Sequence, residues 1–387
     1  MGEAYIVEAV RTAGGRARKG GLVSVHPADL GAAVLNALVD RSGIDAAAVD
    51  DVIVGCVTQA GEQSFAFGRN LVLASRLPDS VPAVTIDRQC GSSQQALHFA
   101  AQAVMSGTQD IVIAAGAESM TRAPMGSNFT LHRDAGIGVG PWPDSIRNRY
   151  GVAEFSQFHG AQAIADKYGL TREAMDAFAL VSHRKAAAAI ASGAFRDEIV
   201  PVETASGVFD QDDGVRMDAS AAGLADLKPL AEGGTITAGN ASQMTDGASG
   251  VLVVGAAALK RFGLTPIARV VALSVTAGDP VVMLEEPIPA TRKVLERAGL
   301  SLADIDLFEV NEAFASVPMA WQQALRADPE KLNVNGGAIA LGHPLGASGT
   351  KLMATLVHAL RARGGRYGLQ TMCEGGGIAN ATIVERL

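Results

Sequence analysis

The sequence predicts an α/β protein built from two similar halves with an insertion, and three observations support this. The first hundred residues alternate strand and helix patterns. The C-terminal part repeats this plan in the same order. The stretch from about 118 to 243 has no counterpart in the other half. Alternating strands and helices are typical of a sheet that is covered by helices on both faces.

The expected elements of the first half follow from hydrophobic periodicity. Strands are predicted over 4–10, 51–55 and 110–116, and the last of these is a continuous apolar run, which favours burial on both faces. Helices are predicted over 27–42 and 64–74. In the first of these, Leu30, Val34 and Leu38 share one face.

The repeat is visible as short matching segments at a nearly constant offset. Residues 41–44 are echoed by 297–300, and 91–93 are echoed by 346–348. Chance similarity among segments rich in alanine and glycine is the alternative, but the matching order makes it less favoured. Two copies of one unit predict pseudo-symmetric halves and a site that draws residues from both.

Composition limits the class of protein. The chain has 387 residues, 48% of them apolar and 19% charged, which predicts two or three folded units with large cores. A net charge of −8 argues against nucleic acid as a partner. We expect no membrane span and no secretory signal, since no apolar run is long enough and the first residues lack the signal pattern.

The cysteines are three in number and widely spaced: Cys56, Cys90 and Cys373. An odd count at such spacing favours reduced thiols in the cytoplasm over a disulfide framework or a zinc site, so we expect no metal.

The insertion carries turn clusters and two predicted helices, near 159–168 and over 171–192. Thr171 is a start signal for the second helix and Gly193 a stop signal. We expect the insertion to lie over the site and to help bind the substrate.

Cys90 lies where a predicted strand that opens at Val84 passes, through a tight turn containing residues 91–93, into a helix with Gly107 as its stop signal. The unpaired N–H groups and the dipole of a helix N-terminus favour an anion, so this position predicts a thiol pKa below the usual value of about 8.5. The chemical interpretation is a nucleophilic thiolate. The structural alternative is a small buried apolar side chain.

Three further stretches place polar side chains after predicted strands or in glycine-rich turns. Asn311 and Glu312 follow one strand, His343 lies in the glycine-rich loop 335–349, and Cys373 ends a strand before Gly375. Each has a structural alternative: a helix cap, a hydrogen-bonded loop histidine, or glycines that let backbones approach. The loop lacks the GxxxxGK[ST] pattern of a phosphate-binding loop.

Together these residues match the needs of carbon–carbon bond exchange on a thioester. One thiolate attacks a carbonyl and holds the acyl group. An imidazole takes up its proton, and a second acid/base moves a proton to and from the α-carbon. Donors must face the oxygen that becomes negative.

Five motifs carry a resemblance to the thiolase family over essentially the whole chain. They are CGSS at 90–93, GNAS at 239–242, NEAFA at 311–315, GHPLG at 342–346 and CEGGG at 373–377. The resemblance implies the thiolase fold, two mixed-sheet halves in a five-layer α-β-α-β-α sandwich with an inserted loop domain. The implied domains are 1–117 plus 246–265 for the N-terminal core, 118–245 for the loop domain and 266–387 for the C-terminal core.

The resemblance also implies roles for individual residues. Cys90 resembles the acylated nucleophile, His343 its activator and Cys373 the acid/base. A water held by Asn311 resembles, with His343, one oxyanion hole, and the N–H groups of Cys90 and Gly375 resemble the other. Ser242 resembles the residue that touches the pantetheine arm of coenzyme A, and Arg216 the residue near its adenine.

The implied activity is CoA-dependent cleavage of 3-ketoacyl-CoA to acetyl-CoA and a shortened acyl-CoA, and the reverse condensation. Coenzyme A is then a substrate and not a permanently bound cofactor, and the setting is lipid metabolism such as β-oxidation. The resemblance implies a homodimer or homotetramer, in which the strand 110–116 is expected to pair across or near a two-fold axis.

Some positions depart from the commoner family pattern. Asp87 stands where many members have Asn, Ser93 where Gly is frequent, and Glu374 where an apolar residue or Gly is common. Residues 156–159 replace a His-Met pair of short-chain biosynthetic members, which leaves the acyl-chain preference open. Two rival interpretations are a decarboxylating β-ketoacyl synthase and a non-catalytic acyl-CoA or sterol carrier. The presence of both Cys90 and Cys373 favours a thiolase over either.

Overall fold

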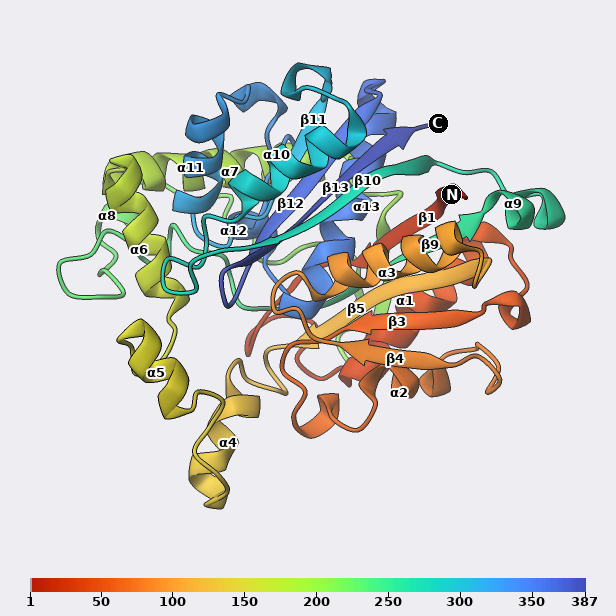
Figure 1. Ribbon diagram of the computed structural model, residues 1–387, viewed down its shortest axis with the longest axis horizontal. Coiled ribbons are helices and arrows are strands. Elements are labelled where there is room, and N and C mark those ends of the chain that lie inside the picture. The colour runs from red at the N-terminus through yellow and green to blue at the C-terminus, as the bar shows by residue number, and fades with distance from the viewer. Residues whose placement is uncertain (1) are drawn as a thin grey trace.

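The computed structural model describes residues 2–387, and its central feature is one mixed sheet of 11 strands (Figure 1). The strands are β1 (Ala4–Thr12), β2 (Gly15–Arg16), β3 (Asp51–Gly55), β4 (Ala83–Ile86), β5 (Ile111–Ser119), β6 (Ile199–Val200), β9 (Thr245–Gly255), β10 (Ala268–Ala277), β11 (Leu307–Val310), β12 (Tyr367–Glu374) and β13 (Ile378–Arg386). Their order is β11-β12-β13-β10-β1-β9-β5-β3-β4, with β2 beside β9 and β6 beside β1.

The sheet repeats one topology twice. The first half runs β1-β9-β5-β3-β4 and the second β10-β13-β12-β11, and each contains the same parallel pair, β3 with β5 and β11 with β12. The halves join edge to edge where Tyr5 and Ile6 pair with Arg269 and Ala268. The predicted internal repeat is therefore confirmed, although this contact links the two expected sheets into one.

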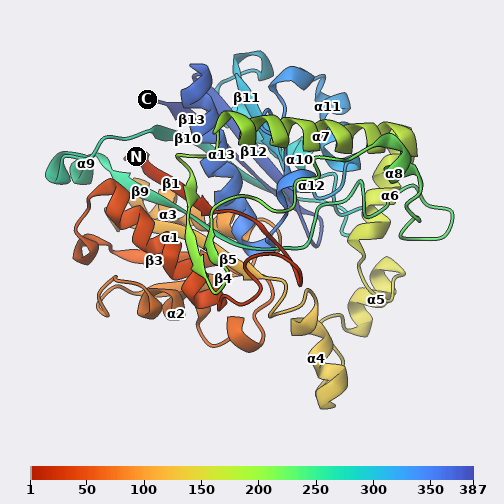
Figure 2. The ribbon, with the colours of Figure 1, turned by 180° about the vertical axis from the view of Figure 1, so that it is seen from behind.

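Helices cover both faces of each half. They are α1 (Pro27–Ser42), α2 (Phe67–Ala74), α3 (Ser92–Ser106), α9 (Ala256–Phe262), α10 (Pro287–Ala298), α11 (Ser316–Leu325), α12 (Ala338–Leu341) and α13 (Ser348–Arg363). Short 3₁₀ turns lie at Ala46–Ala48, Gly61–Gln63, Leu302–Asp304, Pro329–Lys331 and Leu345–Ala347. Helices α3 and α13 pack on each other and on strands of the sheet, whereas α1 and α10 pack on strands of the first and second half, respectively (Figures 1 and 2).

Strand β5 shows why its sequence is apolar without interruption. Ile111 and Ile113 belong to the core that α1 covers, and the alternate residues Val112 and Ala114 belong to the core that holds α3 and α13. Successive side chains of a strand point to opposite faces, so a strand buried on both sides needs apolar residues throughout.

The position of β5 also corrects one expectation. It lies inside the sheet, hydrogen-bonded to β3 on one side and β9 on the other. Its backbone groups are thus already used, and 110–116 cannot pair across a two-fold axis. Strand β4 is the strand at this edge of the sheet.

Helix boundaries agree with the sequence signals in most places. Helix α1 spans the predicted residues, and α3 ends at Gly107 in the left-handed conformation (φ 76°). Helix α2 begins only at Phe67, later than predicted, because Phe65 and Ala66 have φ values of 54° and 51°. Such φ values do not belong to a right-handed helix. In the range 2–387, no helix is both long and apolar enough to cross a membrane.

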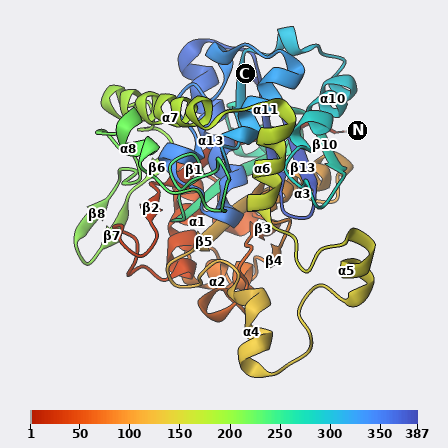
Figure 3. The ribbon, with the colours of Figure 1, turned by 90° about the vertical axis from the view of Figure 1, so that its left-hand side faces the viewer.

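The insertion contributes α4 (Ser127–Ala135), α5 (Asp144–Tyr150), α6 (Gln157–Tyr168), α7 (Arg172–Ser192), α8 (Ala221–Ala225) and the hairpin of β7 (Val202–Thr204) and β8 (Gly207–Phe209). Helix α7 has the predicted cap, since Thr171 accepts a hydrogen bond from the Ala174 N–H. Helix α6 packs on α11, and α7 packs on α12. Figure 3 shows α4 and α5 standing away from the sheet.

Candidate active site

The turn that carries Cys90 lies between a strand and a helix, as predicted, but the helix begins within the predicted turn. Strand β4 ends at Ile86, and α3 begins at Ser92. Gln89 is left-handed (φ 47°), and the Ser92 hydroxyl donates to the Gln89 carbonyl at 2.6 Å. The half-buried Cys90 thus lies just before the helix N-terminus, where it packs against a small apolar cluster that includes Met120 and Leu345.

The acidity expected for Cys90 is not what the structure shows. Burial and the nearby Glu374 carboxylate raise the pKa of Cys90 to about 12, and the backbone N–H groups lower it by less. The prediction of a depressed pKa was therefore wrong. Desolvation penalises the thiolate more than the helix N-terminus favours it.

The repeat places the two candidate loops side by side. The N-termini of α3 and α13 meet, and the Thr350 N–H donates to the Ser93 hydroxyl at 3.0 Å. Glycine is required at this junction, since a Cβ on Gly349 would lie 2.0 Å from the Gln94 nitrogen and one on Gly116 2.3 Å from the Gly346 oxygen. These close approaches bring the Cys90 turn to the loop that carries His343.

His343 is buried and held on several sides. Its N–H donates to the Gln243 carbonyl (3.0 Å), and its ring Nδ1 contacts the Ser348 hydroxyl. Ser348 donates its proton to the Pro344 carbonyl at 2.9 Å. A hydroxyl has one proton, so Ser348 accepts from Nδ1–H and Nε2 carries the lone pair. Burial, followed by the charge of Lys351, lowers the pKa of His343 to about 3, which keeps the ring neutral.

Asn311 faces that free nitrogen. Its Nδ2 lies 3.4 Å from the His343 Nε2, and its own N–H donates to the Thr371 carbonyl at 3.1 Å. Its buried Oδ1 has no hydrogen-bond partner among the described residues. Buried polar atoms are normally satisfied, so this oxygen is suited to hold a water molecule.

Cys373 lies near the end of β12 and is fully buried. Burial raises its pKa well above the usual range, and the next cause is a charge on Cys90. Glu374, the residue after Cys373, lies against Gly91, the residue after Cys90, so the segments that carry the two thiols are in contact. The structure thus brings Cys90, Cys373, His343 and Asn311 together from the two halves.

The other predicted residues lie in different settings. A Cβ on Gly375 would meet the Gln89 side chain at 2.9 Å, which puts the Gly375 backbone beside the Cys90 turn. Ser242 is half-buried, and its N–H donates to the Ala313 carbonyl at 2.9 Å. Arg216 is an exposed residue of the insertion whose N–H donates to the His183 ring at 3.1 Å.

Glu118 and Glu312 are supporting residues to which the sequence analysis assigned no role. The buried Glu118 carboxylate accepts from the N–H groups of Val57, Thr58 and Gly346, each at 2.9 Å, and so ties the His343 loop to the first half. The Glu312 carboxylate accepts from Ser182, Asn333 and Ile339. A charged residue that directly follows a long apolar run was the available signal for Glu118.

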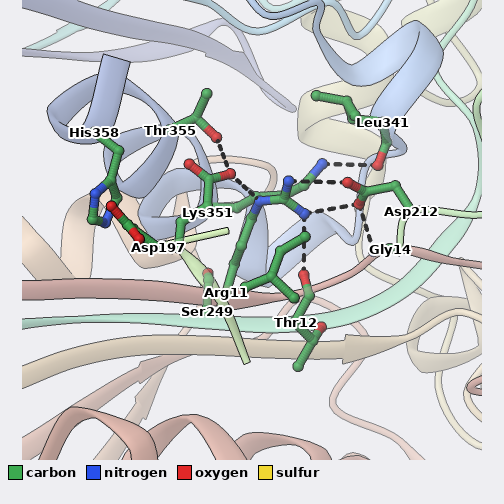
Figure 4. Close-up of polar contacts among 12 residues, drawn as sticks. Arg11, Thr12, Gly14, Asp197, Asp212, Ser249, Leu341, Lys351, Thr355 and His358 are labelled. Carbon is green, nitrogen blue, oxygen red and sulfur yellow. Dashed lines mark hydrogen bonds and ion pairs between the residues drawn. The ribbon is translucent and has the colours of Figure 1, made fainter. Parts of the chain in front are cut away.

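A group of buried charged residues lies next to the loop that carries His343 (Figure 4). Lys351 donates to the carbonyls of Leu341 and Gly342 at 2.9 and 2.8 Å, immediately before His343. Arg11 pairs with Asp212 at 2.8 Å and with Glu198 at 2.5 Å. Thr355 of α13 donates to the Glu198 carboxylate at 3.0 Å, so these ion pairs connect β1, the insertion and α13.

Cys56 lies outside this chemistry. It is a fully buried member of the core that α1 covers, and burial raises the pKa of its thiol well above the usual range. Replacing Cys56 with alanine is expected to leave turnover within a few-fold and to lower the free energy of unfolding by about 1–2 kcal/mol. Steady-state kinetics and urea unfolding check this. A loss of turnover as large as that of Cys90→Ser would contradict it.

Comparisons with known proteins agree with this arrangement. Residues 4–257 match the thiolase N-terminal domain and 264–386 the thiolase C-terminal domain. The steroid 3-ketoacyl-CoA thiolase FadA6 of Mycobacterium tuberculosis is 53% identical, with 100% of this chain and 95% of the relative covered. The 3-ketoacyl-CoA thiolase of Bacillus subtilis is 42% identical and the acetyl-CoA acetyltransferase of Escherichia coli 43% identical, each with 100% of both chains covered. The chain therefore belongs to the thiolase family.

Proposed function

We propose that the protein is an acyltransferase that cleaves 3-ketoacyl-CoA with coenzyme A to give acetyl-CoA and a shortened acyl-CoA, and that runs the reverse condensation. The observation that carries this is the meeting of the half-buried Cys90 thiol and the buried Cys373 thiol with a neutral imidazole and an amide. Family membership supports it, since the relatives named above are 3-ketoacyl-CoA thiolases and an acetyl-CoA acetyltransferase. Both thiols also distinguish it from a decarboxylating synthase and from a carrier.

Cleavage begins at Cys90. His343 accepts the thiol proton at Nε2 while the sulfur attacks the 3-keto carbon, so that no free thiolate is needed beforehand. The N–H groups of Cys90 and Gly375 donate to the oxygen that becomes negative. The carbon–carbon bond then breaks and leaves an acyl group on Cys90 and the enolate of acetyl-CoA.

Cys373 supplies the proton that the enolate needs. A thiol whose pKa is raised keeps its proton at neutral pH and is a suitable acid for this step. The enolate oxygen is stabilised by His343 Nε2–H and by a water on Asn311. The Cys373 thiolate then takes the proton of the coenzyme A thiol, whose sulfur attacks the acyl-Cys90 thioester, and the Cys90 sulfur leaves and takes back its proton from His343 Nε2–H.

Coenzyme A is a substrate in this scheme. We assign Ser242 to its pantetheine arm and Arg216 to the region of its adenine, both in or beside the insertion. The exposed Arg216 is suited to an anionic ligand, because guanidinium groups bind phosphates well.

Bulky 3-ketoacyl groups are the acyl class that we favour. The relative at 53% identity is a steroid 3-ketoacyl-CoA thiolase, a higher identity than the 43% of the acetyl-CoA acetyltransferase. Beside the Asn311 segment, Phe158 of the insertion packs edge to face on Phe314, with ring centroids 5.7 Å apart. Initial rates with ring-bearing 3-ketoacyl-CoA substrates should exceed those with acetoacetyl-CoA, and the reverse order would exclude this preference.

The acyl-enzyme is the direct test of the activity. Brief exposure to acyl-CoA should add an acyl mass to the peptide that contains Cys90, and the kinetics should be ping-pong, because the first product leaves before the second substrate binds. Peptide mass spectrometry locates the adduct. Cys90→Ser is the control that should carry none, and an adduct on Cys56 alone would refute the assignment.

The architecture implied by the family completes the proposal. Helices on both faces of two half-sheets, with α3 and α13 between them, fit five α-β-α-β-α layers. We keep the division into 1–117 plus 246–265, 118–245 and 266–387. The three free cysteines support a reducing, cytoplasmic setting.

We predict a homodimer formed through the β4 edge. Val84 on this strand is 45% exposed and Phe65 nearby is 90% exposed, which is apolar surface that a second copy would cover. Light scattering should give at least a dimer at micromolar concentration, and Val84→Lys should weaken it. Only monomer in the unmodified protein would contradict the prediction. A homotetramer remains compatible with it.

A further inference from the structure

Glu374 is a fully buried carboxyl in an unusual place. It follows Cys373 on β12, where alternate side chains point to opposite faces of the sheet. Neither of its oxygens has a hydrogen-bond partner in the part of the chain that the structure describes. A buried carboxylate without donors is costly, and such groups normally keep a proton instead.

The carboxyl lies directly behind the nucleophile. A Cβ on Gly91 would be 1.9 Å from Oε1 and 2.5 Å from Cδ of Glu374, so the Glu374 side chain occupies the space that a side chain at 91 would need. Gly91 is the residue after Cys90, and its φ of −87° places no demand for glycine. Glycine at position 91 therefore leaves room for the Glu374 side chain.

The groups around Glu374 offer it little compensation. Burial raises the pKa of Glu374 well above the usual range, and it outweighs the charge of Arg88 and the Asn380 backbone N–H, which lower that pKa. Across residues 2–387, the buried Nε of Arg88 likewise finds no hydrogen-bond partner. Asn380 on β13 pairs with Met372, two residues before Glu374, and its Oδ1 is also buried and without a partner among the described residues. The other titratable groups that face this region are Asp87 and Cys90 in the turn, His98 on α3, Cys373 on β12 and Glu118 on β5.

We propose that Glu374 is a positioning residue that holds a proton behind Cys90, and that its negative charge, once formed, suppresses the Cys90 thiolate. Two adjacent groups that both become anionic cannot ionise independently. The neutral carboxyl permits thiolate character at Cys90, whereas the ionised carboxyl opposes it. The link to catalysis rests on the nucleophile assigned above, since the same sulfur is the leaving group when coenzyme A attacks the acyl-enzyme.

The test measures Cys90 acidity without turnover. Iodoacetamide alkylates the thiolate, forming a carbon–sulfur bond and releasing iodide, and mass spectrometry follows the Cys90 peptide from pH 6.5 to 9.5. Glu374→Gln keeps the shape and removes the charge. The Cys90 alkylation rate of Glu374→Gln should equal that of the unmodified protein at pH 6.5 and should exceed it about tenfold at pH 9.5. A tenfold difference corresponds to a change of about one unit in the pKa of Cys90.

Matched variants separate charge from shape. Glu374→Leu should reproduce the pH-dependent ratio, because it also lacks the charge, and it serves if the glutamine variant does not fold. Asp87→Asn removes an exposed carboxylate of the same turn. The ratio of its Cys90 alkylation rate to that of the unmodified protein should stay close to one and should not change with pH. A pH-independent ratio for the Glu374 variants would overturn the proposal. That failure leaves the acyl-enzyme test untouched, so it is distinguishable from failure of the proposed function.

Discussion

Cys373→Ser is expected to accept an acetyl group from acetyl-CoA on Cys90 but to lose condensation by about 10²–10⁴-fold, the range that one acid/base group supplies. The α-proton of the second substrate must be removed by a base placed against that carbon. A serine hydroxyl is far less acidic than a thiol, so its alkoxide is too scarce to act. Acyl-enzyme mass and exchange of α-hydrogen in deuterated buffer are measured together.

Cys90→Ser is the matched control and should fail differently. It should lose the covalent acyl-enzyme itself, since the attacking sulfur is gone. The unmodified protein should show both signals. If the Cys373 variant exchanged α-hydrogen at the rate of the unmodified protein, the base would be His343 or another group. The roles assigned to the two cysteines would then be wrong.

Arg11→Met is expected to lower the free energy of unfolding by about 3–5 kcal/mol, the usual cost of breaking a buried ion pair from one side. The guanidinium is fully buried between Asp212 and Glu198, and the change leaves both carboxylates without it. Urea unfolding at pH 7 measures the loss. Turnover should fall as well, because Glu198 also accepts from Thr355 on α13, the helix whose Lys351 donates to the His343 loop.

The pH dependence of this deficit provides a second measurement. Burial raises the pKa of the Asp212 carboxyl. Arg11 outweighs burial and brings this pKa below its usual value. A carboxyl whose pKa is lower in the folded state stabilises the protein at pH values above its unfolded-state pKa of about 3.9. This stabilisation is lost as the pH falls from there through the folded-state pKa. The deficit of Arg11→Met should therefore shrink in acid.

Arg269→Met is the control for this prediction. Arg269 also pairs with two carboxylates, Glu3 and Glu385, but it is partly exposed. Exposed ion pairs contribute about 0–1 kcal/mol. Equal losses in the free energy of unfolding for Arg11→Met and Arg269→Met would mean that burial of the Arg11 ion pairs adds nothing to stability.

Local patterns predicted much of the fold. The boundaries of α1, the end of α3 and the cap of α7 follow from periodicity and from residues such as Thr171 and Gly107. The late start of α2 did not follow, because the left-handed Phe65 and Ala66 have no sequence signature. The neighbours of β5 depend on strand order, which lies beyond any local pattern.

The sequence by itself determined the repeat, the family motifs and the candidate residues Cys90, His343 and Cys373, because each depends on residue type and spacing. The tertiary structure alone decided their acidity, since the pKa of a thiol depends on what surrounds it. Burial and Glu374, distant in the chain, reverse the effect expected of the helix N-terminus on Cys90. Long-range packing likewise placed Glu374 against Gly91 and Arg11 between two carboxylates, contacts that no local pattern encodes.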